Sequence, residues 1–283
     1  MVLAQRLAIK VVGHLGFDVL YRESLLIDSF WGGSLFHFVS GATSVGSKLN
    51  LCSACPLDDW AAPISVWRSC GHDVTGVQAK EHETRFHCFY DRSGSFIHSK
   101  FEIENPFALS TLGRDSRKFD ILHLCPMNVD DASDLALSMP HSALSLQTHM
   151  TLIEGNRSRF LALCGRADYL FLNMEEAEYL FEKKDVYAIA DTAQAKCLCT
   201  FITNETEAYC ISEGRVLKVN SPLVVVADAI GAGDTFAGAA LGIQYLTGNP
   251  KAALSVGTYV ASAQVCGSLS RFLYENIRDI EVH

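Results

Sequence analysis

The stretch Asp228-Ala-Ile-Gly-Ala-Gly-Asp234-Thr-Phe-Ala-Gly238 is the most informative part of this sequence. Its Gly-Ala-Gly turn leads into the segment 235–245, whose apolar residues recur at helical spacing, and Thr247-Gly248-Asn249-Pro250 is a strong helix terminator. Upstream, the β-branched run Leu223-Val-Val-Val-Ala227 predicts a buried strand. A strand, a glycine turn and a helix N-terminus together predict an anion site, because unpaired amides and the helix dipole point at one place.

The same stretch puts a carboxylate in the first turn of the helix. A carboxylate beside bound phosphate is electrostatically unfavourable unless it removes a proton there. We therefore interpret Asp234 as the general base of a phosphoryl transfer to a hydroxyl, with Gly231, Ala232 and Gly233 forming the anion hole. Tight packing of the helix against the strand is the structural alternative, but packing does not explain the position of Asp234.

Composition indicates a well-buried globular chain. The 283 residues suffice for one large α/β domain, and 49% hydrophobic against 19% charged residues argue against disorder. The net charge of -9 disfavours nucleic acid and anionic membranes as partners, and no apolar run reaches the length of a membrane span. Ten scattered cysteines and an N-terminus without a signal-peptide layout favour a cytoplasmic location.

Apolar runs alternate with helical patterns along most of the chain. This alternation predicts an α/β fold with a mainly parallel sheet covered on both faces, whose ligands collect at the carboxyl ends of the strands. The expected strands are Leu7–His14, Leu49–Cys55, Phe119–Cys125, Ala143–Gln147, Tyr169–Asn173, Leu198–Thr203 and Ala208–Ser212. The expected helices lie near 33–47, 58–70, 130–138, 155–166 and 174–183.

The region 81–104 interrupts this alternation. Two segments with strand-like patterns flank Asp91-Arg-Ser-Gly94, which is typical of a hairpin turn. Their alternating apolar and polar residues imply that one face of the hairpin is buried and the other is exposed to solvent. The segment 19–31 predicts a further strand.

The stretch from Asp228 to Asp234 closely resembles the signature of the ribokinase-like (PfkB) carbohydrate kinases, Asp-Thr-x-Gly-Ala-Gly-Asp, with Ala229 in place of the threonine. The resemblance implies a three-layer sandwich forming one kinase domain over 1–283, with the segments near 19–31 and 81–104 as a small β-sheet lid over the substrate. It further implies ATP and Mg²⁺ as cofactors and a hydroxyl of a small sugar, polyol or nucleoside as the phosphate acceptor. A homodimer through the lid is a candidate assembly.

Near the N-terminus, Gly13-His-Leu-Gly-Phe-Asp18 matches the family's Gly-x-x-x-x-Asp, whose aspartate binds sugar hydroxyls. A carboxylate suits this role because it accepts two hydroxyl hydrogens, although an aspartate that caps the following turn is the alternative. Gly32 and Gly33 resemble a Gly-Gly element whose backbone closely approaches the substrate. Gly16 and His37 stand where many sugar kinases have asparagine, so we expect an acceptor other than ribose. His37 is equally well interpreted as a satisfied helix-face histidine.

Asn173-Met-Glu-Glu176 matches the family's Asn-x-x-Glu, which helps to place Mg²⁺ and the phosphates, largely through water. Asn173 and Glu176 also read as an N-cap and its capping-box partner, and the two interpretations are compatible. Gln147, at the end of an expected strand, stands where the family often has aspartate.

On the nucleotide side, Thr203 begins a segment that resembles the family's Thr-x-Gly-x-x-Gly, with Glu205 and Ala208 in place of its glycines. The resemblance assigns the helix containing Ala261 to the wall of the adenine site. It also assigns Asp228 to a monovalent cation site, for which K⁺ is the candidate.

Two other functions fit part of these observations. The missing glycines favour a catalytically weak, kinase-like sensor of sugar or nucleotide, whereas the intact Asp234 argues against it. A pyridoxal or hydroxymethylpyrimidine kinase would have the same fold but lack the lid hairpin and the element Gly32–Gly33.

Overall fold

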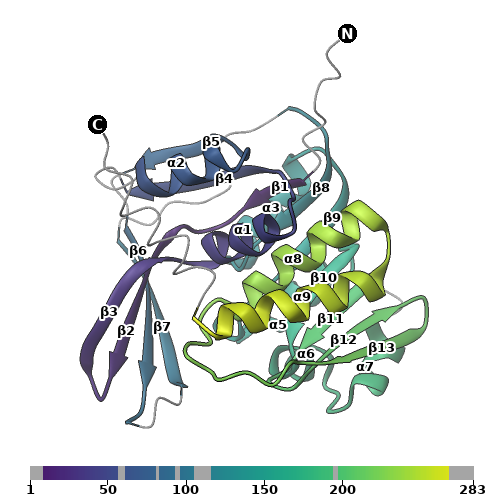
Figure 1. Cartoon of the computed structure of the whole chain (residues 1–283). Helices are drawn as coiled ribbons and strands as arrows, with labels where there is room; N and C mark the ends of the chain where they lie inside the picture. The colour runs from purple at the N-terminus through teal and green to yellow at the C-terminus, as the bar shows by residue number, and fades with distance from the viewer. Residues whose placement is uncertain are drawn as a thin grey trace.

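The computed structural model describes residues 9–56, 61–80, 83–92, 96–104, 116–193 and 197–267. These residues form one large and one small β-sheet (Figure 1). The strands are β1 (Ile9–Val12), β2 (Gly16–Arg22), β3 (Leu25–Gly32), β4 (Leu49–Pro56), β5 (Asp73–Lys80), β6 (Glu83–Tyr90), β7 (Phe96–Glu104), β8 (Phe119–Leu124), β9 (His141–Gln147), β10 (Tyr169–Asn173), β11 (Cys199–Thr203), β12 (Glu207–Ser212) and β13 (Arg215–Asn220). The helices are α1 (Ser34–Ser44), α2 (Ala61–Ser69), α3 (Val129–Ser138), α4 (Met150–Ile153), α5 (Arg157–Cys164), α6 (Met174–Phe181), α7 (Val186–Ala193), α8 (Ala232–Thr247) and α9 (Pro250–Val265).

The large sheet has the strand order β13-β12-β11-β10-β9-β8-β1-β4-β5. The strands from β11 to β5 pair in parallel, and β12 and β13 add an antiparallel edge. The prediction of a mainly parallel sheet is therefore confirmed. Every strand listed above for the alternating part of the chain is present, although residues 7 and 8 of the first lie outside the described ranges. The strands β5 and β13 and the helices α4 and α7 were not predicted from the sequence.

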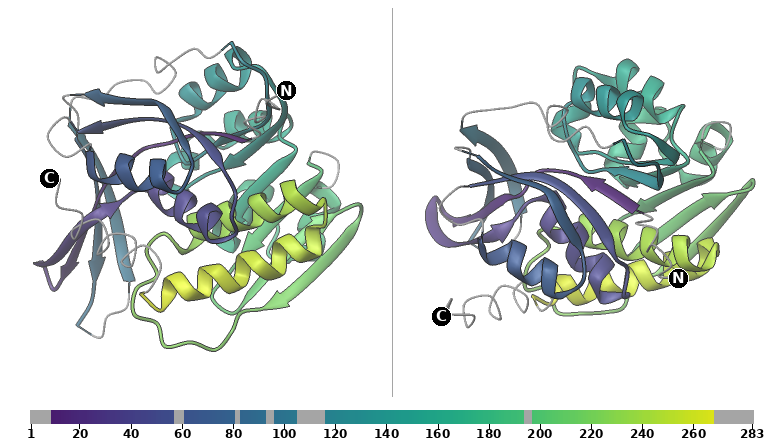
Figure 2. Two further views of the ribbon diagram at one scale, coloured as in Figure 1. Left: turned by 45° about the horizontal axis from the view of Figure 1, so that its top comes forward. Right: turned by 90° about the horizontal axis from the view of Figure 1, so that it is seen from above.

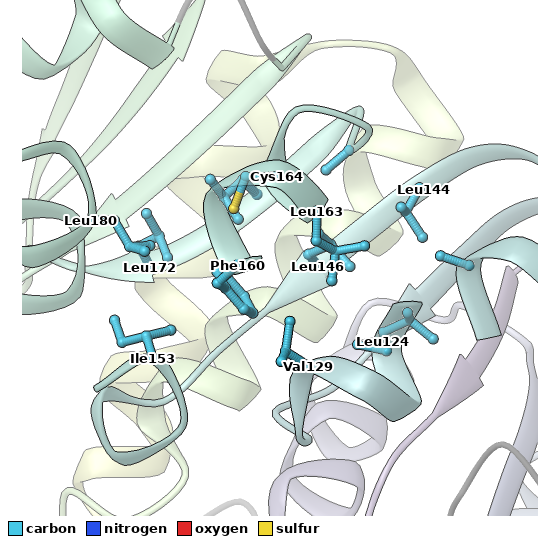
Figure 3. Packing of buried hydrophobic residues seen from close by; sticks show 14 of the residues in the cluster. Leu124, Val129, Leu144, Leu146, Ile153, Phe160, Leu163, Cys164, Leu172 and Leu180 are labelled. Atoms are coloured by element: carbon cyan, nitrogen blue, oxygen red, sulfur yellow. The ribbon is translucent and has the colours of Figure 1, made fainter. Parts of the chain in front are cut away.

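Helices cover both faces of the large sheet (Figure 2). Successive residues of β10 show why. Leu170 and Leu172 belong to an apolar cluster that contains residues of α3 to α7, whereas Phe171 between them belongs to a second cluster that contains residues of α1, α2, α8 and α9. Side chains alternate across a strand, so a strand buried on both faces reads as a continuous apolar run. In Figure 3, strand residues such as Leu146 meet Phe160 and Leu163 of α5. The large sheet therefore carries one apolar cluster on each of its faces.

The small sheet has the order β3-β2-β6-β7. Two antiparallel hairpins, β2–β3 and β6–β7, are joined by parallel pairing of β2 with β6. The segment 19–31 therefore supplies parts of two strands rather than one, because Glu23 and Ser24 adopt positive φ and reverse the chain. Residues 81 and 82, and residues 93 and 94 of the predicted hairpin turn Asp91–Gly94, lie outside the described ranges. The flanking strands β6 and β7 pair as expected.

The prediction of a buried strand at Leu223–Ala227 is wrong. This segment belongs to no strand, and Leu223 and Val225 are almost fully exposed, with Val226 at 65%. The edge of the sheet is occupied by β13 instead. A short apolar run carries no periodicity that distinguishes a core strand from a segment whose apolar side chains line a cavity. None of the helices in the described ranges is long and apolar enough to cross a membrane.

Candidate active site

Helix α8 begins at the glycine turn, as predicted, and ends at Gly248. Gly231 is its N-cap, with φ 67° in the left-handed region, and no side chain caps the helix. The Ala232 amide donates to the Ala229 carbonyl (3.2 Å), which fixes the turn. The Gly233 amide, which follows, has no acceptor four residues earlier within the helix. A side chain at Gly233 would meet no atom within 4 Å, so this uncapped N-terminus is open to a ligand.

Asp234 lies in this first turn of α8 and is partly exposed. Its Oδ1 accepts a hydrogen bond from Gln147 Nε2 (2.8 Å), at the carboxyl end of β9. Burial is the main cause that raises the pKa of Asp234 from 3.8 to about 7; the charge of His37 and the Gln147 hydrogen bond lower it, and Asp18 raises it. A carboxylate that titrates near neutrality suits the exchange of a proton at physiological pH.

Asp18 and His37 form a buried pair next to this turn. Asp18 lies inside β2 of the small sheet. Its Oδ2 is 2.6 Å from His37 Nε2, its Oδ1 accepts the amide of Gly33 (3.1 Å), and both side chains are almost fully buried. Burial alone would lower the pKa of His37, but the Asp18, Asp234 and Asp228 carboxylates together raise it. The three carboxylates therefore favour the protonated form of His37.

Two glycines make room for this pair. A Cβ at Gly32 would lie 2.1 Å from the Asp18 carboxyl carbon, and a Cβ at Gly231 would lie 2.1 Å from the His37 ring. The Gly32–Gly33 element therefore contacts Asp18 directly. Thr235 Oγ1 also donates to the His37 carbonyl across α1 and α8 (3.4 Å). The glycine turn, the imidazole and the Asp18 carboxylate therefore lie in direct contact.

Asn173 and Glu176 form the capping box that their spacing suggested. The Asn173 side chain accepts the Glu176 amide (2.8 Å), and Glu176 Oε2 accepts the Asn173 amide (2.9 Å). Glu176 is 4% exposed. Its burial raises its pKa to about 8, and the charge of Asp234 contributes to the increase. Asn173 is paired with Thr203 in the β10–β11 register, so the two lie together at the carboxyl edge of the sheet.

A cavity of about 800 Å³ adjoins the glycine turn. It reaches Ala232 and Gly233, and Thr203 and Ala261 are among its lining residues. Its further lining residues include Glu205, Thr206, Glu207, Ala208, Leu223, Val224, Val226, Phe236, Thr258 and Val265. Glu205 is exposed, and Glu207 is paired with Lys218. The apolar segment that was predicted as a strand is therefore one wall of this cavity.

Asp228 links the signature to the small sheet. The carboxylate is buried, and its Oδ1 accepts hydrogen bonds from the Ile230 amide (2.9 Å) and from the hydroxyl of Tyr90 (3.1 Å), the last residue of β6. Tyr90 was not predicted as a site residue from the sequence. The alternation along β6 indicates on which face of the strand a side chain lies, but not that the Tyr90 hydroxyl meets Asp228. Within the described ranges, no group of three or more His, Cys, Asp and Glu side chains is arranged to hold a metal ion.

Comparisons with known proteins agree with this geometry. A family model described as pfkB family carbohydrate kinase matches residues 126–276. A comparison with curated protein sequences found no match. Among solved structures, the chain is similar to a Burkholderia thailandensis nucleoside kinase in complex with inosine (TM-score 0.79, 13% identity, 94% of each chain covered). It is also similar to a Methanocaldococcus jannaschii nucleoside kinase (TM-score 0.77, 14% identity, 96% of this chain and 98% of the other) and to a Sinorhizobium meliloti adenosine kinase (TM-score 0.74, 17% identity, 98% and 100%).

At these identities the solved structures show the fold, which is ribokinase-like. Together with the family match, they define a phosphotransferase that acts on a hydroxyl acceptor. The chain belongs to the pfkB family of carbohydrate kinases, whose model matches more than half of its length.

Proposed function

We propose that the chain transfers the γ-phosphoryl group of ATP to a hydroxyl of a small sugar, polyol or nucleoside, with Asp234 as the general base. One observation carries the proposal: a carboxylate with a pKa of about 7 lies in the first turn of a helix whose N-terminus is uncapped and open. The amides of this turn would stabilise the transferring negative charge while Asp234 takes the hydroxyl proton. Gly231, Ala232 and Gly233 build that turn.

For the acceptor, we propose that Asp18 orients a hydroxyl and that His37 holds Asp18 in place. Both carboxylate oxygens of Asp18 already accept one hydrogen each, and each oxygen retains a second lone pair. The hydrogen-bonding nitrogens of the His37 ring extend to a different distance from the backbone than the side-chain amide of the asparagine in many sugar kinases. The preferred acceptor is therefore a polyol, sugar or nucleoside other than ribose. The Burkholderia kinase was solved with inosine, which supports including nucleosides among the acceptors to be tested.

For the nucleotide, we propose that the cavity beside Gly233 takes ATP, with Thr203 and Ala261 in its walls. Glu176 and Asn173 fit Mg²⁺, because a cation would favour the ionised form of Glu176, whose pKa is raised by burial and by the charge of Asp234. When bound, Mg²⁺ neutralises part of the phosphate charge. For K⁺ we propose a site that includes the backbone near Asp228, since the Asp228 side chain itself is engaged by Tyr90 and Ile230.

We further propose that residues 1–283 make one kinase domain and that the small sheet is its lid. Asp18 and Tyr90, both in this sheet, contact His37 and Asp228 on the other side of the site, which supports the lid role. A homodimer through this sheet would cover the exposed side chains of Leu25, Leu26 and Ile97. Sedimentation of a variant with Leu25→Glu and Leu26→Glu would test that assembly.

The test of the proposed function is ATP consumption with a panel of sugars, polyols and nucleosides. Asp234→Asn should lower turnover by about 10²–10⁴-fold, the usual contribution of a positioned acid or base. ATP binding should survive, because the backbone turn remains. Asp134→Asn, an exposed aspartate on α3, is the control and should turn over normally. Ligand binding without any ATP turnover in the unaltered protein would instead support a sensor.

A further inference from the structure

Gln147 contacts the proposed base directly. It is the last residue of β9, and its amide nitrogen donates to Asp234 Oδ1 at 2.8 Å. An ionised carboxylate only accepts hydrogen bonds, so the NH₂ end of the amide must face it. The two residues are 87 positions apart, and their contact joins the carboxyl edge of the large sheet to the first turn of α8.

The other end of the same amide is unsatisfied. Gln147 Oε1 is buried and has no hydrogen-bond partner among the residues that the structure describes. A buried polar atom without a partner destabilises the folded state. The hydrogen bond to Asp234 is therefore the one favourable polar contact that this side chain makes among the described residues.

The surroundings of Asp234 explain what this contact can do. Titratable groups face the site from several elements: His37 on α1, Asp18 on β2, Glu176 on α6 and Cys125 after β8. The acidic groups and burial oppose ionisation of Asp234, and His37 favours it. Gln147 adds a neutral donor that stabilises the ionised carboxylate without attracting the phosphates. Its hydrogen bond occupies Oδ1 and leaves Oδ2 available for a proton.

We propose that Gln147 is a positioning residue that holds Asp234 by Oδ1, so that Oδ2 accepts the proton of the acceptor hydroxyl. This inference rests on the proposed function of Asp234. In the transfer step, the acceptor oxygen loses its proton to Oδ2 and bonds to the γ-phosphorus, and the bond from that phosphorus to the bridging oxygen of ATP breaks with ADP as leaving group.

The test compares Gln147→Met with the unaltered protein. Methionine matches glutamine in length but donates no hydrogen bond. Gln244→Met is the matched control, because Gln244 likewise has a buried, unpartnered Oε1 and lies on α8 about three turns beyond Asp234. The readouts are kcat and KM from pH 5.5 to 9.5, the melting temperature, and the pH titration of the Asp234 carboxyl carbon followed by ¹³C NMR. The signal is assigned by its loss in Asp234→Asn.

We expect Gln147→Met to lower kcat at pH 7 about 10-fold or more, with KM for ATP and acceptor within about 2-fold. The loss of a donor to the ionised form should move the titration of Asp234 above its pKa of about 7 and shift the rise of kcat to higher pH. The melting temperature should not fall, and Gln244→Met should leave kcat and the titration unchanged.

An unchanged kcat profile and an unchanged Asp234 titration in Gln147→Met would overturn the inference. Failure of this variant to fold would also contradict it, because the amide would then be structural. The proposed function fails separately: if Asp234→Asn turns over normally, Asp234 is not the base. If Asp234→Asn is inactive while Gln147→Met behaves like the unaltered protein, only the role of Gln147 is lost.

Discussion

Replacing Asp234 by asparagine should make the protein more stable while it removes the proposed base. The folded-state pKa of Asp234 is about 7, against 3.8 for an ordinary aspartate. An acid whose folded pKa is raised destabilises the folded state as it ionises, so the destabilisation develops as pH increases from 3.8 to about 7. At about 1.36 kcal/mol per pKa unit, the full difference corresponds to roughly 4 kcal/mol. Since the Asp234 side chain is partly exposed, water screens its charge. We therefore expect Asp234→Asn to increase the free energy of unfolding by about 2–4 kcal/mol.

The assay is urea unfolding of the unaltered protein and of Asp234→Asn at pH 5 and pH 8. Asparagine keeps an oxygen that can accept the Gln147 hydrogen bond, so the substitution removes the charge while this contact remains possible. The gain in unfolding free energy should be near its maximum at pH 8 and less than half of that at pH 5. Asp134→Asn should show no comparable gain at either pH. Equal stability of Asp234→Asn and the unaltered protein at pH 8, or a gain that does not depend on pH, would refute the reasoning.

Two further substitutions test the pair beside the turn. The pKa of His37 is raised above 6.5 in the folded state, so its stabilising contribution is fully present below pH 6.5 and is lost as pH increases through the folded pKa. His37→Gln leaves the Asp18 carboxylate buried without its cation and should cost about 3–5 kcal/mol near pH 6, with a smaller loss at pH 9, measured by urea unfolding. A loss independent of pH would contradict the charged pair. Gly231→Ala should cost more than about 2 kcal/mol, because its positive φ strains the backbone and its Cβ meets the His37 ring. Gly248→Ala is its control: φ is also positive (63°), but no atom lies within 4 Å of the added Cβ, so melting curves should show a clearly smaller loss.

Local patterns in the sequence were sufficient for much of the fold. Alternating strand and helix signals predicted the parallel sheet, and the caps of α6 and α8 were readable because capping depends on neighbours a few positions apart. The prediction of a strand at Leu223–Ala227 was wrong because neighbouring residues do not decide the structure of this run. Its apolar side chains fit a strand as well as a cavity wall, and only the position of β13 at the sheet edge decides between them.

The sequence by itself determined the family resemblance, the helix that carries Asp234 and the short-range partnership of Asn173 with Glu176. Only the tertiary structure decided which side chains those residues meet. His37 contacts Asp18 at a separation of 19 positions, Gln147 contacts Asp234 at 87, and Tyr90 contacts Asp228 at 138. Such contacts leave no periodic signal in the chain, because they arise where strand ends and helix ends from different layers converge. Burial and neighbouring charge, which set the pKa values of Asp234 and His37, exist only after that convergence.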